Sequence, residues 1–204
     1  MLVALLVTGL VGFALLAVLY DHDPLAAIDQ EVAERVAEGM PTWVEWLGRP
    51  FSWVGGWIGL APISVGLVLL LLVTRRIFDA LWVALTLAGI HIVTPLLKEA
   101  FDRPRPDEGS AVPLPSSDSF PSGHASGAVV TFGVLATICV ERWPERARLL
   151  WSAAVAFVVA IGVSRTVLNV HFVTDVLAGW YVGLAWFAGA LLVHELLRSR
   201  ATPK

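Results

Sequence analysis

Three short polar segments, 98–106, 121–124 and 164–175, interrupt a sequence that is otherwise largely apolar. They combine cations, small hydrogen-bond donors, two histidines and a carboxylate, which are groups that can bind and transfer a phosphoryl group. Arginine offers a rigid fork of donors to paired phosphate oxygens, whereas lysine offers a compact charge. The candidate site residues are Lys98, Arg105, Ser122, Gly123, His124, Arg165, His171 and Asp175.

His171 and Asp175 are four residues apart, so they would share one face of a helix. A carboxylate that accepts a proton from one ring nitrogen leaves the other nitrogen free to attack as a nucleophile. A structural cap at the start of a helix is the alternative interpretation of this pair. A metal site is a further alternative, but no additional carboxylate or cysteine suggests a closed ligand shell around His124 and His171. We therefore predict chemistry that needs no metal ion or other cofactor.

Ser122 and Gly123 predict the start of a helix, because serine is a favoured N-cap and glycine leaves the backbone accessible. Free backbone N–H groups at such a start can bind an oxyanion with the help of the helix dipole. His124 would place a proton donor at the same mouth. Anchoring at the membrane interface is the alternative for a single cation such as Lys98, but three cations beside two histidines favour a site.

The elements that must position these segments are membrane spans. The chain has 204 residues, of which 57% are hydrophobic and 15% charged, whereas a soluble domain carries about 25% charged residues. Six apolar segments approach the ~20 residues that cross the hydrocarbon core. We expect transmembrane helices at 2–20, 51–74, 78–97, 123–140, 149–163 and 175–197. The sequence therefore predicts an all-α fold, in which residues 1–204 form a single domain built as an integral membrane bundle of six helices.

Positive charge is unevenly distributed between the two sets of connections that these spans define. Eight of the 14 lysines and arginines lie on one side, namely Arg75, Arg76, Arg142, Arg146, Arg148, Arg198, Arg200 and Lys204. By the positive-inside rule this side faces the cytoplasm, which predicts cytoplasmic termini and an outer face that carries all three polar segments. The formal net charge of −3 is too small to suggest a nucleic-acid partner.

An acidic stretch, residues 21–50, separates the first two expected spans. Within it, apolar residues recur at every fourth position, which predicts a short amphipathic helix at the membrane surface. These residues are Ile28, Val32, Val36 and Met40.

Two features inside the expected spans have structural explanations. His91 precedes Lys98 by seven residues, and we interpret it as a buried, hydrogen-bonded histidine rather than a catalytic one. Gly179 and Gly183 form a small-residue face in the last span. We expect this face to pack inside the bundle, with a dimer seam as the alternative.

In order and spacing, the three polar segments resemble the tripartite signature of the type 2 phosphatidic acid phosphatase family. The matching stretches are Lys98-x6-Arg105-Pro106, Pro121-Ser122-Gly123-His124 and Ser164-Arg165-x5-His171-x3-Asp175. The six-span layout agrees over nearly the whole chain. The resemblance implies a membrane-embedded, metal-independent phosphatase that hydrolyses a lipid phosphomonoester or pyrophosphate. Phosphatidic acid, phosphatidylglycerol phosphate and polyprenyl pyrophosphate are the expected kinds of substrate.

The resemblance also implies a role for each candidate residue. His171 would be the nucleophile that forms a phosphohistidine, Asp175 its orienting partner, and His124 the general acid that later activates water. The implied phosphate cradle is Lys98, Arg105, Ser122, Gly123 and Arg165. Arg103 repeats the Arg-Pro pair two residues early, and the family spacing leaves it to contact loop carboxylates such as Asp107 or Glu108.

Two other functions are compatible with this pattern. Vanadium-dependent haloperoxidases have a similar anion cradle, but they are large soluble proteins and this chain is mostly membrane span. A lipid-binding or transport protein without enzymatic activity could retain the same fold, although intact His124, His171 and Asp175 favour an enzyme. The expected partners are the lipid phosphate and the surrounding membrane lipids, and both a diacylglycerol and a long isoprenoid remain open as the lipid part.

Overall fold

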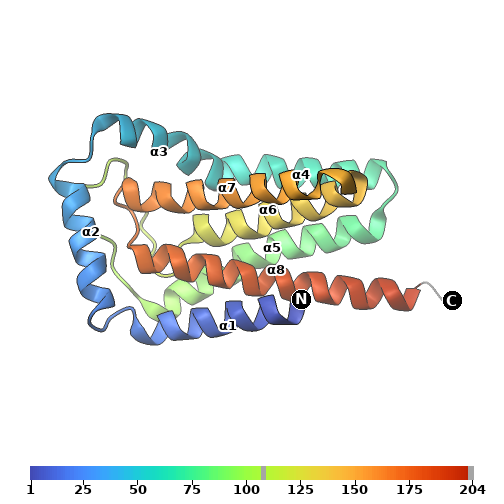
Figure 1. The fold of residues 1–204 in the computed structure, drawn as a ribbon, viewed down its shortest axis with the longest axis horizontal. Helices are drawn as coiled ribbons and strands as arrows, with labels where there is room; N and C mark the ends of the chain where they lie inside the picture. Colours follow the sequence, from blue (N-terminus) through green and yellow to red (C-terminus); the bar gives the residue numbers. More distant parts are fainter. Residues whose placement is uncertain (107–108, 202–204) are drawn as a thin grey trace.

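The chain folds into a bundle of helices whose long axes run side by side (Figure 1). The computed structural model describes residues 1–106 and 109–201, and these residues form helices and no strand. The elements are α1 (Leu2–Leu19), α2 (Leu25–Gly39), α3 (Thr42–Gly55), α4 (Trp57–Val73), α5 (Ile77–Phe101), α6 (Gly123–Arg142), η1 (Pro144–Arg146), α7 (Ala147–Val167) and α8 (Val173–Ala201). The predicted all-α fold is therefore confirmed.

Within the described residues, five helices are long and apolar enough to cross a membrane: α1, α5, α6, α7 with η1, and α8. The pair α3 and α4 passes the same test together but is bent by 43° at the break between them, and it supplies the sixth span if counted as one. The prediction of one continuous span over 51–74 is corrected, because helix already begins at Thr42 and is interrupted at Gly56. Gly56 is extended rather than helical, with φ −77° and ψ 170°.

Helix α8 packs closely on α6 through small residues. A Cβ added to Gly179 would lie 2.5 Å from the carbonyl oxygen of Ser122, and one added to Gly183 would lie 2.8 Å from that of Ser126. The expected internal packing face is therefore confirmed. The close approach also lets the backbone N–H of Ser122 donate to the carbonyl oxygen of Asp175 at 2.9 Å. Two of the three polar segments are thereby joined directly.

The predicted short helix between the first two spans forms as α2, and the residues it buries are mostly not the four recurring apolar ones. Of the four predicted apolar positions only Val36 is buried, and Ile28 is 46% exposed. The buried positions of α2 are Asp29, Ala33 and Val36. The reason is that α2 crosses the end of the bundle and contacts α8 there, so a polar contact with protein determines which face turns inward (Figure 1).

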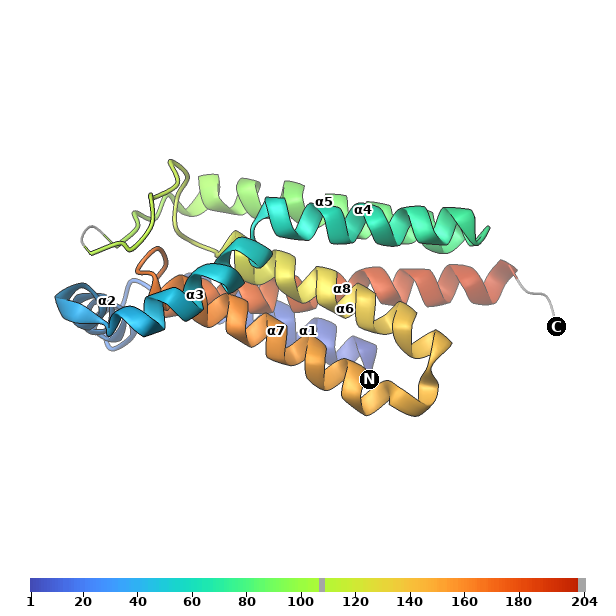
Figure 2. The ribbon, with the colours of Figure 1, turned by 90° about the horizontal axis from the view of Figure 1, so that it is seen from above.

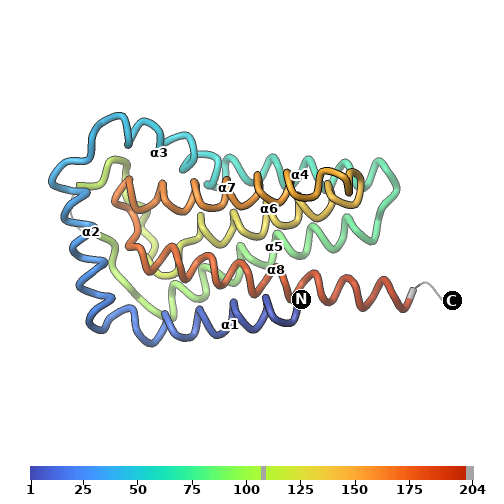
Figure 3. The backbone as a smooth tube through the Cα atoms, viewed as in Figure 1, coloured from blue at the N-terminus to red at the C-terminus, as the bar shows by residue number. Residues whose placement is uncertain are grey.

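The three polar segments meet at one end of the bundle (Figure 3). Residues 102–106 and 109–122, the start of α6 and the turn 168–172 between α7 and α8 all lie at this end. The turn between α4 and α5, the connection from α6 to α7 and the end of α8 lie at the other. The described cations of that second end are Arg75, Arg76, Arg142, Arg146, Arg148, Arg198 and Arg200. The charge asymmetry therefore separates the two ends of the described structure.

Replacing Gly179 with alanine tests the close packing of α8 on α6. The added Cβ meets backbone atoms of Ser122, which cannot move without disturbing the start of α6, so we expect a destabilisation of about 1–3 kcal/mol. The measurement is the thermal unfolding midpoint in detergent. Gly66→Ala is the matched control, because nothing lies within 4 Å of a Cβ at that helical glycine. Equal midpoints for the two variants would contradict the assignment.

Candidate active site

A cavity of about 640 Å³ lies at the end where the polar segments meet. Its walls come from the α3–α4 break, from α5, α6 and α7, and from the loops before α6 and α8. Six predicted site residues line it, namely Lys98, Arg105, Gly123, His124, Arg165 and His171. Ser122 and Asp175 are both fully buried and are not among the lining residues. The structure therefore brings all three polar segments together around one space, with these two residues behind its wall.

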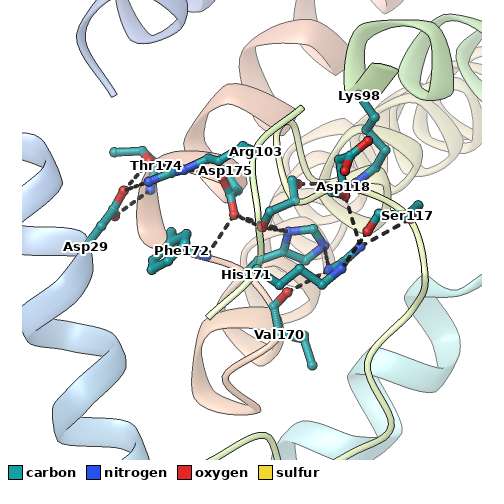
Figure 4. A network of polar contacts seen from close by, with 12 residues as sticks. Asp29, Lys98, Arg103, Ser117, Asp118, Val170, His171, Phe172, Thr174 and Asp175 are labelled. Atoms are coloured by element: carbon teal, nitrogen blue, oxygen red, sulfur yellow. Dashed lines mark hydrogen bonds and ion pairs between the residues drawn. The ribbon is translucent and has the colours of Figure 1, made fainter. Parts of the chain in front are cut away.

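His171 is held between a carboxylate and a cation (Figure 4). Its Nδ1 lies 3.3 Å from Oδ2 of Asp175, and its Nε2 lies 3.1 Å from Nη1 of Arg105. A guanidinium can only donate hydrogen bonds, so this geometry requires an unprotonated Nε2 and places the ring proton on Nδ1. The nitrogen with the free electron pair is thus the one that faces a lining cation.

The ring of His171 is 3% exposed. The pKa of His171 is lowered to about 4, chiefly by burial and also by the charges of Arg105 and Lys98, while the hydrogen bond and charge of Asp175 act in the opposite direction. The imidazole is therefore neutral near pH 7. A neutral ring is the form that can act as a nucleophile.

Asp175 has partners on every side. Its Oδ1 accepts from Nη1 of Arg103 at 2.6 Å, and its Oδ2 accepts from the hydroxyl of Ser119 and from the backbone N–H of Phe172 at 2.8 Å. Sequence reasoning missed Ser119, which stands just outside the second polar segment. The only signal for it was its place in the Ser-rich loop before α6.

Arg103 is placed differently from the loop contact that was predicted. The carboxylates expected as its partners, Asp107 and Glu108, lie outside the described residues. Its described partners are the buried carboxylates of Asp29 and Asp175, at 2.9 and 2.6 Å. Arg103 therefore belongs to the polar network behind His171, because α2 brings Asp29 within reach.

The three lining cations are held mainly by uncharged oxygens. Nζ of Lys98 donates to the carbonyl oxygens of Asp118 and Ser119. The guanidinium of Arg105 donates to the carbonyl oxygens of Ser117, Asp118 and Val170. Arg165 donates to the hydroxyl of Ser52 in α3, and its buried Nε has no hydrogen-bond partner among the described residues.

Carboxylates do not neutralise these cations directly. The ion pairs among the described residues do not include Lys98, Arg105 or Arg165. Three cations that share one partly enclosed cavity attract an anion strongly, because the low-dielectric walls weaken screening. The site is therefore suited to a phosphate group.

The second segment lies at the start of α6. Ser122 occupies the N-cap position, but its side chain makes no capping hydrogen bond and its buried hydroxyl has no partner among the described residues. The next residues, Gly123 and His124, belong to the first turn, where backbone N–H groups have no intrahelical acceptor. His124 packs beside the α3–α4 break, where a Cβ on Gly56 would lie 3.4 Å from its Nε2.

His91 does not have the buried, hydrogen-bonded environment that was expected. It is exposed, it lines the cavity two turns before Lys98, and it has no hydrogen-bond partner among the described residues. The reason is that α4 and α5 form a separate pair on one side of the bundle (Figure 2), so this face of α5 borders the cavity rather than a packed core.

Together these features define a class of protein, a membrane-embedded helical bundle with a cation-rich histidine site at one end. The sequence matches the PAP2 superfamily over residues 79–199, which is more than half of the chain. The chain therefore belongs to the PAP2 superfamily, and it is a membrane-embedded phosphatase. The matched region contains all eight candidate site residues.

Similar proteins agree with this membership. The chain is 29% identical over 178 residues to phosphatidylglycerophosphatase B of Bacillus subtilis (strain 168), which covers 86% of this chain and 87% of that protein. It is 26% identical over 156 residues to an undecaprenyl-diphosphatase of Sulfolobus acidocaldarius, which covers 74% and 66% of the two chains. The crystal structure of a transmembrane PAP2 type phosphatidylglycerolphosphate phosphatase from Bacillus subtilis matches with a TM-score of 0.86 at 26% identity, over 97% of each chain. The fold is shared over nearly the whole length.

The charge state of His171 can be measured directly. Because its pKa is lowered to about 4, we expect its ring to remain neutral as the pH falls from 7 to 5, where an ordinary histidine (pKa about 6.5) is mostly protonated. The measurement is the ring ¹⁵N chemical shift in protein labelled at histidine, with the His171 signals assigned by their loss in His171→Gln. A titration midpoint near 6.5 would contradict the buried environment.

Proposed function

We propose that this phosphatase hydrolyses a lipid phosphomonoester or pyrophosphate through a phosphohistidine formed at His171. The observation that carries the proposal is the unprotonated Nε2 of His171, which lies beside Arg105 at a cavity that Lys98 and Arg165 also line. We further propose that residues 1–204 form one domain, since α1 and α8 pack against each other from the two ends of the chain.

In the first step the phosphate displaces Arg105 from Nε2 of His171. The three cations and the free N–H groups of α6 bind its oxygens, and Nε2 attacks phosphorus as the bond to the leaving oxygen breaks. His124 gives a proton to that oxygen, so the lipid leaves as an alcohol or, from a pyrophosphate, as a monophosphate. Asp175 accepts the Nδ1 proton in a hydrogen bond and stabilises the positive ring.

In the second step water releases the phosphate. His124, now without that proton, accepts one from the attacking water as the bond between phosphorus and Nε2 breaks. Inorganic phosphate leaves, and both histidines return to their starting states. The cycle balances without an added cofactor.

The shape of the cavity supports a lipid substrate. From the cations its lining continues along α4 and α5 to Trp57, Ile90 and His91, which lie in apolar helices. A phosphate bound among the cations can thus keep its lipid part within the bilayer. The named activities of the similar Bacillus subtilis proteins make phosphatidylglycerol phosphate the first substrate to test, and the archaeal relative makes a polyprenyl pyrophosphate the second.

The activity test uses protein purified in detergent with a chelator present. We expect phosphate release from phosphatidylglycerol phosphate, phosphatidic acid or a polyprenyl pyrophosphate, reduced at least about a thousandfold in His171→Ala because the nucleophile is lost. His22→Ala is the matched control, since His22 is exposed and is not among the residues that line the cavity. Equal release by wild type and His171→Ala would show that another group attacks phosphorus.

The covalent intermediate can be trapped in the same assay. We expect His124→Ala to form the phosphohistidine faster than it hydrolyses it. Hydrolysis needs His124 to activate the water, whereas the leaving group of a reactive pyrophosphate departs more easily without a proton from His124. Substrate labelled with ³²P should then leave acid-labile, alkali-stable label on the protein. No such label should appear in the double variant with His171→Ala.

We also propose that the site lies on the outer face of the cell membrane and that both termini are cytoplasmic. The support is the cluster of arginines at the end opposite the site, together with the positive-inside rule.

Cysteine labelling tests this orientation. In a Cys139→Ser background, which removes the only cysteine, Ser116→Cys should react with a membrane-impermeant maleimide in intact cells, whereas Glu145→Cys should react only after lysis. Both positions are exposed in the structure, so a difference in labelling would report only on which side of the membrane each residue lies. The reverse pattern would invert the proposed orientation.

A further inference from the structure

The two arginines of the sequence Arg103-Pro-Arg105 have different surroundings. Arg105 lines the cavity, whereas Arg103 is not among the lining residues. The side chain of Arg103 is only 10% exposed and lies behind the His171–Asp175 pair (Figure 4). A phosphate in the cavity would therefore contact the guanidinium of Arg105 and not that of Arg103.

Both terminal nitrogens of the Arg103 guanidinium have hydrogen-bond partners. Nη1 donates to Oδ1 of Asp175 at 2.6 Å and to the hydroxyl of Thr174 at 2.7 Å, while Nη2 donates to Oδ2 of Asp29 at 2.9 Å. The guanidinium carbon also lies over the rings of Tyr20 and Phe172, 4.7 and 4.3 Å from the ring centres. The cation thus bridges two buried carboxylates in one orientation, as a planar fork of donors allows.

These contacts determine how Asp175 meets His171. Because Arg103 occupies Oδ1, the other oxygen, Oδ2, is the one that faces Nδ1 of His171. That arrangement keeps the ring proton on Nδ1 and leaves Nε2 as the nucleophilic nitrogen. Asp29 shares the cation, so Arg103 orients Asp175 without neutralising it completely.

Asp29 connects this pair to α2. Its Oδ1 accepts from the backbone N–H of Thr174 at 3.0 Å, at the start of α8 and one residue before Asp175. A second contact on the same helix runs from the side chain of Asn169 to the carbonyl oxygen of Ala33 at 3.1 Å. Helix α2 is therefore hydrogen-bonded to the chain on both sides of His171.

We propose that Arg103 is a positioning residue which, held by Asp29 of α2, orients Asp175 and thereby sets the tautomer and direction of the His171 ring. This inference rests on the proposed function for its kinetic consequence, but not for its structural one. Helix α2, which contributes no lining residue to the cavity, then controls the reaction rate through the Asp29–Arg103–Asp175 connection.

The kinetic test compares Arg103→Gln with Arg105→Gln on the best lipid substrate. We expect Arg103→Gln to lower kcat about 10–100-fold with little change in KM, as the loss of an orienting partner typically does. Arg105→Gln should instead also raise KM, because it removes a phosphate ligand. Asp29→Asn should lower kcat in the same way as Arg103→Gln, and the double variant should be no worse than the poorer single variant. Arg35→Gln, an exposed change on α2, is the control.

Chemical rescue distinguishes positioning from mere stabilisation. In Arg103→Ala, added guanidinium ion should restore part of kcat, because it can occupy the space between the two carboxylates. Methylammonium of equal concentration should restore less, since it cannot bridge them in a plane. A thermal midpoint in detergent records whether each variant is folded, and Asp29→Asn, which keeps the side-chain size, provides the folded case if Arg103→Ala is not.

The second readout does not depend on turnover. Ring ¹⁵N shifts of His171 should show one tautomer, with the proton on Nδ1, in the wild type and in Arg35→Gln. Averaging between the two tautomers is expected in Arg103→Gln and Asp29→Asn. Wild-type tautomer shifts in both variants, or an unchanged kcat, would overturn the inference. If the wild type hydrolyses none of the lipids, the proposed function fails, while the tautomer measurement still tests the role of Arg103.

Discussion

The buried carboxylate of Asp175 is the constraint on which the site depends. A carboxylate with no exposed surface is costly unless charged and hydrogen-bonding partners replace the lost water. The required donors come from separate parts of the chain: Arg103 and Ser119 from the long loop, and His171 and the backbone N–H of Phe172 from the turn before α8. Satisfying this one group therefore brings the loop and the α7–α8 turn together behind the cavity.

The cations in the wall of the cavity, unlike Arg103, are held without carboxylate partners in the part of the chain that the structure describes. They are held by carbonyl and hydroxyl oxygens of Ser52, Ser117, Asp118 and Val170, which orient them without cancelling their charge. The carboxylates of Asp29 and Asp175 thus lie behind the wall, paired with Arg103. The lining cations form no ion pair with a carboxylate among the described residues, although Glu99 and Asp118 also line the cavity. This division of charge lets one small site both bind a phosphate and keep a neutral nucleophile beside it.

Much of this architecture was predictable because it depends on local sequence. Apolar length indicates a span, since it needs only neighbouring residues. The i, i+4 spacing also paired His171 with Asp175 correctly, although His171 lies in the turn before α8 and not on a shared helix face. The expectation for His91 was wrong because it assumed a packed neighbour on every face of α5, and the side towards the cavity lacks one. The face of α2 that packs on the protein could not be predicted, since hydrophobic periodicity gives no weight to a buried carboxylate such as Asp29.

The sequence by itself determined that the chain is a helical membrane protein and that its three polar segments form the signature of a phosphatase family. The motif spacing selected Arg105 for the phosphate cradle, but it could not show where Arg103 lies, because nothing near Arg103 in the sequence identifies its partners. Only the tertiary structure decided that one guanidinium lies behind the site and the other lines it. The physical reason is that the partners of Arg103, Asp29 and Asp175, are 146 positions apart in the chain and meet only when α2 crosses the end of α8.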